Sequence, residues 1–297
     1  MKHRVWTICL AAVGGFVLIL DSKTALYGAS EGVELCLRTV IPTMLPFFVL
    51  SLLLTGSLAG TSIPLLRPLG RLCAIPEGGE VLFLVGILGG YPTGAQAVAH
   101  AYESGQLSRN TARRLLGFCS NAGPAFLFGI VASRFCRLRY AWILWAIHIL
   151  GAVAAGALLP GRQAETVKIS PAPLLTIQQA LKKSVRILSE VCGWIILCRV
   201  VIAFCERWFL WLFPNWVQLL FTGMIELANG CWQLGTSPDE GVRFVMASAM
   251  LSMGGLCVLL QTKSVTKSLG LGQYFPGKLI QTAVCVTVSA LYWLFLR

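Results

Sequence analysis

Residues 81–94 read VLFLVGILGGYPTG, and this stretch decides how the chain can fold. Its apolar run Val81–Leu88 is far shorter than the roughly 20 residues that a helix needs to cross a bilayer. Three glycines and a proline then interrupt it over Gly89–Gly94, before apolar residues resume over Ala95–Ala101. A break of this kind is tolerated inside a membrane where the freed backbone faces protein or water. The pattern predicts a re-entrant hairpin or a discontinuous helix, and one kinked helix over 81–101 is the alternative.

A second break follows in residues 117–126, which read GFCSNAGPAF. The apolar segment Gly117–Val131 is interrupted at Ser120–Pro124 by small and polar residues and a proline. Between the two breaks, Ser104–Leu116 is polar and basic. We expect it to form a short surface helix, with Ser108 or Asn110 as its N-cap.

The composition places these breaks in a membrane protein. Of the 297 residues, 56% are hydrophobic and only 12% are charged, and the mean hydropathy is +0.75; soluble domains carry roughly 25% charged residues. Strand-like alternation is absent, so helices are the expected spanning form. We predict an all-α polytopic membrane protein with seven to nine membrane segments, two of them broken or re-entrant. The clear apolar blocks are Val5–Leu20, Leu45–Leu58, Tyr140–Leu159, Val191–Phe204, Phe244–Leu260 and Leu279–Leu296.

The net charge of +12 does not indicate nucleic acid, because the basic residues lie between apolar blocks, as loops near anionic lipid do. The 11 cysteines form no CxxC pair, so we predict no metal site. His3, His100 and His148 have no nucleophile or ligand at a useful spacing, and we predict no enzymatic activity. His148 is expected to form buried or interhelical hydrogen bonds.

The pattern divides the chain into four parts. Residues 1–32 are an uncleaved transmembrane helix followed by a polar outside loop over 21–32, with a cleavable signal peptide as the alternative. Residues 33–160 form a first repeat, 161–187 a polar linker and interfacial helix, and 188–297 a second repeat. If the two repeats are inverted relative to each other, the basic stretch Arg134–Arg139 lies outside, against the positive-inside rule.

The two repeats are weakly similar in sequence. Leu82–Gly86 can be aligned with Leu219–Gly223, and Ala122–Gly123 with Gly254–Gly255, at similar offsets. The break in the second repeat spans Glu226–Gln233. Interrupted hydrophobic segments at corresponding places in two halves indicate an inverted repeat and a secondary transporter.

The candidate solute site consists of the residues at these breaks. Glu226 is the strongest candidate, because a carboxylate in an apolar segment is costly. It could couple transport to H⁺ or Na⁺, pair with Arg199, or lie solvated near the headgroups; no other cofactor is expected. The predicted site residues are Tyr91, Thr93, Gly94, Gln96, Ser120, Asn121, Gly123, Pro124, Glu226, Asn229 and Gln233.

The stretches Gly90–Ala95 and Phe118–Phe126 resemble the YlbJ-type sporulation integral membrane proteins. That family belongs to the nucleoside-recognition (Gate) group, which is similar to the core of concentrative nucleoside transporters. The resemblance covers Leu35 to the C-terminus and implies a multi-pass protein of the bacterial cell membrane or the forespore membrane. It also implies a role in moving dipicolinate toward the spore. Ser120 and Gln96 depart from the family pattern, which has asparagine and often lysine there, and the missing lysine puts an anionic substrate in doubt.

Two functions follow. The first is a permease for a small polar solute, which is a nucleoside-like compound or dipicolinate. The second is a non-transporting scaffold of a sporulation or envelope complex, in which small residues at the breaks serve close helix packing. The expected partners are the lipid bilayer and, for the permease, the solute; a homo-oligomer is left open.

Overall fold

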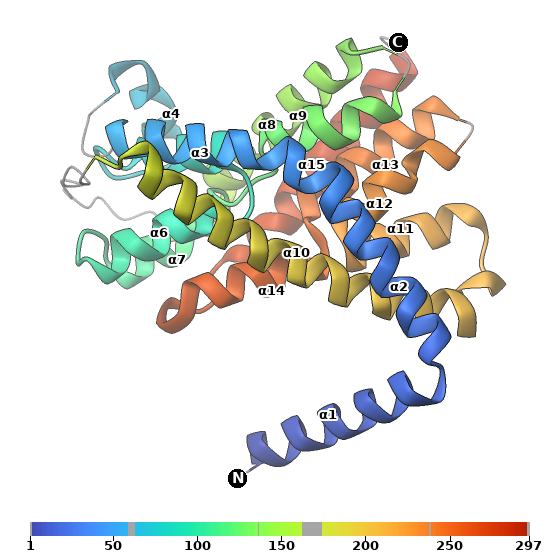
Figure 1. Cartoon of the computed structure of the whole chain (residues 1–297). Helices are drawn as coiled ribbons and strands as arrows, with labels where there is room; N and C mark the ends of the chain where they lie inside the picture. Colours follow the sequence, from blue (N-terminus) through green and yellow to red (C-terminus); the bar gives the residue numbers. More distant parts are fainter. Residues whose placement is uncertain (1, 59–62, 136, 162–173, 238, 296–297) are drawn as a thin grey trace.

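The structure is a computed structural model that describes residues 2–58, 63–135, 137–161, 174–237 and 239–295. Every regular element in these ranges is a helix, as predicted (Figure 1). Helix length and hydropathy identify five candidate membrane spans in the described ranges, and the chain is a multi-pass integral membrane protein. The predicted total of seven to nine segments stays a prediction. The spans are Ser22–Leu54, Arg139–Leu158, Ile177–Trp208, Glu240–Thr266 and Tyr274–Phe295; shorter apolar helices are Ala11–Leu20, Glu80–Gly89 and Pro124–Arg134.

The N-terminal region contains two successive helical segments. Helix α1 (Lys2–Leu20) projects from the body (Figure 1). Helix α2 (Ser22–Leu35), a π-helical turn (Cys36–Val40) and α3 (Ile41–Leu58) follow one another without a loop, and the chain bends between α2 and α3 (Figure 1). The prediction of an outside loop over 21–32 is therefore wrong. Asp21 caps α2 by accepting from Thr24 N at 3.2 Å. Gly28 lets α2 pack closely against the helix that contains Val200, since a methyl group on Gly28 would lie 2.9 Å from Val200 Cα.

The first half contains both predicted breaks. Helix α5 (Glu80–Gly89) ends at the glycines, and α6 (Thr93–Glu103) begins after them and packs against α5. A continuous helix over 81–101 is thus excluded. Ser108 is the N-cap of α7 (Arg109–Leu115), accepting from Thr111 N at 3.2 Å, as predicted. After the second break come α8 (Pro124–Phe126), a π-helical turn (Leu127–Val131), a 3-10 turn (Ala132–Arg134) and α9 (Arg139–Leu158). Before α5, the chain forms a 3-10 turn (Pro64–Leu66) and α4 (Arg67–Leu72).

The second half begins with the longest helix, α10 (Ile177–Trp208). The predicted interfacial helix and the following span are one continuous helix, which starts in a capping box between Thr176 and Gln179. Residues 162–173 of the predicted linker lie outside the described residues. The remaining helices are α11 (Asn215–Ile225), α12 (Leu227–Gln233), α13 (Glu240–Met253), α14 (Gly255–Thr266) and α15 (Tyr274–Phe295), with 3-10 turns at Leu210–Leu212, Leu234–Thr236 and Lys267–Leu269.

Packing brings the two halves together. Helix α10 lies along α2 and α3, and α15 packs against both α9 and α13 (Figure 1). One large apolar cluster joins residues of both halves, including Tyr140 and Phe244, whose rings lie 6.0 Å apart. As a result, the interrupted segments of both halves point into one shared interior.

Candidate functional site

The two breaks of the first half contact each other. Gly90 has a φ of +73°, a conformation that glycine adopts readily. A methyl group on Gly123 would lie 2.9 Å from Gly90 Cα, so the two backbones touch. Gly94 lies in the same way against the Cys119 carbonyl. These predicted glycines therefore allow the close approach of the breaks.

The breaks of the second half have the same relationship. The chain is extended at Glu226, between α11 and α12, and turns again at Gly254, between α13 and α14. A methyl group on Gly255 would lie 2.8 Å from Met224 O at the end of α11. Each half thus holds two interruptions in contact, at the places that the proposed sequence alignment matches. The inverted orientation of the halves stays a prediction.

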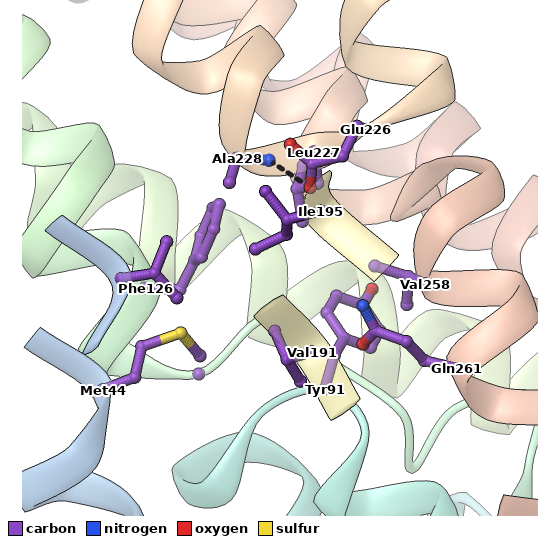
Figure 2. A pocket seen from close by; sticks show the side chains of 12 residues that line it. Met44, Tyr91, Phe126, Val191, Ile195, Glu226, Leu227, Ala228, Val258 and Gln261 are labelled. Carbon is purple, nitrogen blue, oxygen red and sulfur yellow. Dashed lines mark hydrogen bonds between the residues drawn. The ribbon is translucent and has the colours of Figure 1, made fainter. Parts of the chain in front are cut away.

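One buried cavity is lined by interruptions from both halves (Figure 2). Tyr91 and Gly123 come from the first half, and Glu226 and Ala228 come from the second. The free space for water is about 30 Å³, which is room for one or two molecules. The other lining residues are apolar except Gln261; they are Val40, Met44, Phe126, Val191, Ile195, Leu227 and Val258.

Glu226 is buried at this cavity, with 2% of its surface exposed. Its carboxylate caps α12 by accepting from Ala228 N at 3.0 Å (Figure 2). It also accepts from Asn229 N at 2.6 Å and from Asn229 Nδ2 at 2.7 Å. Arg199 instead pairs with Glu206 at 3.0 Å. Both the predicted Arg199 pair and the solvated carboxylate are therefore wrong. The capping role accounts for all three hydrogen bonds of Glu226. Because Glu226 also lines the cavity, a solute or a proton could still reach it.

Behind the cavity wall, Tyr91 leads into a buried polar network. Its hydroxyl donates to Leu251 O at 3.2 Å and accepts from Lys278 Nζ at 2.8 Å. Lys278 is fully buried and also donates to Ser120 O and to Gln281 Oε1 at 2.8 Å. The first-half breaks are thus bound by a lysine from α15, the last helix.

Gln281 extends this network to Asn121 and His148. Its amide donates to Asn121 Oδ1 at 3.0 Å and to His148 O at 3.3 Å. The ring nitrogen Nε2 of His148 accepts from Ala122 N at 3.1 Å. His148 is buried, and the expectation that it forms buried hydrogen bonds is confirmed. Asn121 in turn donates to Phe118 O at 2.8 Å, so the unwound backbone around it is fixed by side chains.

The remaining predicted residues divide between the breaks and the outside. Thr93 bonds to Gly90 O at 2.8 Å, and Asn229 bonds to Glu226, so both stabilise a break. Gln96 is exposed and Gln233 is half-buried, and neither lines the cavity. Sequence reasoning missed Lys278 and Gln281. Lys278 directly precedes the apolar block Leu279–Leu296, where a lysine ordinarily reaches toward the headgroups, so no feature of the sequence marks it as buried.

One comparison supports the resemblance to the YlbJ-type proteins, whereas membership of the Gate group stays a prediction. The chain is 28% identical to the sporulation integral membrane protein YlbJ of Bacillus subtilis (strain 168), and the alignment covers 93% of this chain and 79% of that protein. The chain is a homologue of that protein. No family model matches the sequence, and no solved structure matches it.

Proposed function

We propose that this homologue of YlbJ is a secondary-transporter-like permease that moves a small polar solute across a bacterial cell membrane or forespore membrane during spore formation, without converting it chemically. The observation that carries the proposal is the cavity lined jointly by Tyr91, Gly123 and Glu226, from interrupted segments of both halves. Interrupted helices expose backbone groups and helix ends that bind polar solutes in transporters. The relative is a sporulation integral membrane protein, which supports a role in sporulation.

For such a permease, the small cavity corresponds to a closed state. About 30 Å³ of space for water cannot hold a solute of nucleoside or dicarboxylate size. Transport therefore requires the two halves to separate at this cavity. The hydrogen bond from Tyr91 to Leu251 O at 3.2 Å crosses that boundary and would break on opening.

The lining favours a ring-shaped solute. Phe126 and Tyr91 offer aromatic surface, and Gln261 and Glu226 offer polar groups, which suits a nucleoside-like compound (Figure 2). Dipicolinate would bring two carboxylates toward Glu226, and like charges repel at this distance. Its transport would require a proton on Glu226 or a bound cation, which fits coupling to H⁺ or Na⁺.

Solute uptake into proteoliposomes tests the proposal. The purified chain is reconstituted, and accumulation of dipicolinate, nucleosides and simple carboxylates is measured with proton or sodium gradients against protein-free liposomes. Accumulation of at least one solute class above the protein-free level supports the permease. Uptake that stays at that level for every solute and gradient contradicts it.

A membrane scaffold is the second candidate, and specific observations favour it. The cavity is small, the glycine contacts between breaks are tight, and Glu226 already has three hydrogen bonds. Small residues at such contacts let helices pack closely without any transport role. In that case the breaks serve assembly. The wild type would then accumulate no solute, and substitutions at the cavity would reduce the binding of envelope partners.

A further inference from the structure

Pro124 leaves a backbone acceptor without its usual partner. In a continuous helix, the carbonyl of Ser120 would accept from the N–H of residue 124. Residue 124 is a proline and has no N–H, and the chain is extended at Gly123, with φ −81° and ψ 162°. A buried carbonyl in this position requires another donor. Lys278 Nζ provides it from α15.

The ammonium group of Lys278 is surrounded by neutral oxygen atoms. Its acceptors are a main-chain carbonyl (Ser120), a hydroxyl (Tyr91, 2.8 Å) and an amide oxygen (Gln281, 2.8 Å). Within the ranges that the structure describes, no carboxylate forms an ion pair with it. The titratable groups that face it are Tyr91, Tyr274, Cys119, Cys285 and His148.

This set of ligands is the kind that binds a monovalent metal ion. Hard cations take carbonyl, amide and hydroxyl oxygens, and unwound transporter backbones bind Na⁺ through their carbonyls. Ser120 contributes a further oxygen: its Oγ is buried and has no hydrogen-bond partner among the described residues. The site is therefore built for a cation, and the side chain of Lys278 fills it.

We propose that Lys278 is a tethered cation, occupying the alkali-cation site at the second break of the first half. The chain then needs no free Na⁺ or K⁺ to hold this break closed. Lys278 is a positioning residue, because it acts on the cavity through Tyr91, whose ring lines the cavity while its hydroxyl accepts from the ammonium group. One consequence rests on the proposed permease function: this site cannot couple solute movement to Na⁺, so a coupling ion would have to act elsewhere, such as at Glu226.

Thermal unfolding of the full chain in detergent tests the substitution of lysine for a metal ion. Wild type, Lys278→Ala and Lys278→Met are compared in choline chloride, NaCl and KCl at equal ionic strength. We expect wild type to unfold at the same temperature in all three salts. Lys278→Ala empties the site, so NaCl or KCl should raise its unfolding temperature by about 3 °C or more over choline. Lys278→Met fills the space without charge and should not respond. Lys263→Ala, at an exposed lysine, is the matched control and should behave as wild type.

Two results would overturn the proposal. The first is stabilisation of wild type by NaCl or KCl over choline, because an occupied site cannot bind a second cation. The second is a Lys278→Ala variant that is equally stable, or equally unfolded, in all three salts. No measurement in this series depends on transport, so a failed uptake assay and a failed cation response are separate outcomes.

Discussion

Tyr91 Oη and Lys278 Nζ lie 2.8 Å apart, although 187 positions separate the two residues in the chain. The contact joins the first break to the last helix. Tyr91 also donates to Leu251 O on α13, so one hydroxyl connects three parts of the fold. Its ring forms part of the cavity wall. The state of the polar network can therefore influence the cavity directly.

Tyr91→Phe should destabilise the protein. The substitution removes one acceptor from the buried Lys278 and the donor to Leu251 O, and unsatisfied buried polar groups cost about 1–3 kcal/mol each. We expect a clear fall in the unfolding temperature in detergent. Tyr102→Phe, at a half-buried tyrosine of α6, is the control and should change stability little. Equal stability of both variants would show that the hydroxyl of Tyr91 contributes nothing.

Asn121→Ala should abolish solute accumulation while membrane insertion stays intact. The side chain accepts a hydrogen bond from Gln281 Nε2 and donates one to Phe118 O, so its loss frees the unwound backbone at the second break. Uptake is measured in proteoliposomes, and insertion is measured as the amount of protein in the membrane fraction. Asn110→Ala, at an exposed residue, serves as the control. Normal accumulation by Asn121→Ala would remove this residue from the site.

Glu226→Gln should also abolish accumulation. The amide keeps one acceptor oxygen for the α12 N-terminus but cannot carry a negative charge or bind a proton as a carboxylate does. Insertion should be unaffected, since capping is partly retained. Glu103→Gln changes an exposed carboxylate in the same way and should transport normally. If Glu226→Gln accumulates solute at the wild-type rate, Glu226 is only a helix cap.

Local chemistry allowed the breaks to be predicted from sequence. Glycine and proline interrupt helices through their own backbone properties, so Gly89–Gly94 and Ser120–Pro124 were recognisable without knowledge of their partners. The polar stretch 21–32 was wrongly predicted to be a loop, because the role of its glycines depends on a distant helix. Its glycines serve close contact between α2 and α10, and Gly28 meets Val200, which lies far along the chain.

The composition of the site depended on distant contacts that the sequence does not reveal. Lys278 and Gln281 lie one helical turn apart, so they share a face. Ser120, which Lys278 binds, and Asn121, which Gln281 binds, lie more than 150 residues away in the chain. Gln96 shows the converse. It lies close to a break in sequence, yet the buried face of α6 contains Ala95, Val98 and Ala99, and Gln96 projects from the exposed side.

Gly123→Ala should separate the two first-half breaks. The φ of Gly123 is −81°, which alanine adopts without strain, so any effect comes from the new methyl group. That group would lie 2.9 Å from both Gly90 Cα and Gly90 N, which are backbone atoms that cannot rotate away. We expect a loss of about 1–3 kcal/mol in the free energy of unfolding, measured as a lower unfolding temperature, and reduced solute uptake.

Gly193→Ala on α10 is the control, because nothing lies within 4 Å of its new methyl group. Helix propensity predicts that this control is neutral or more stable by up to about 1 kcal/mol. If both variants respond alike, close contact between the breaks is not required for the closed state.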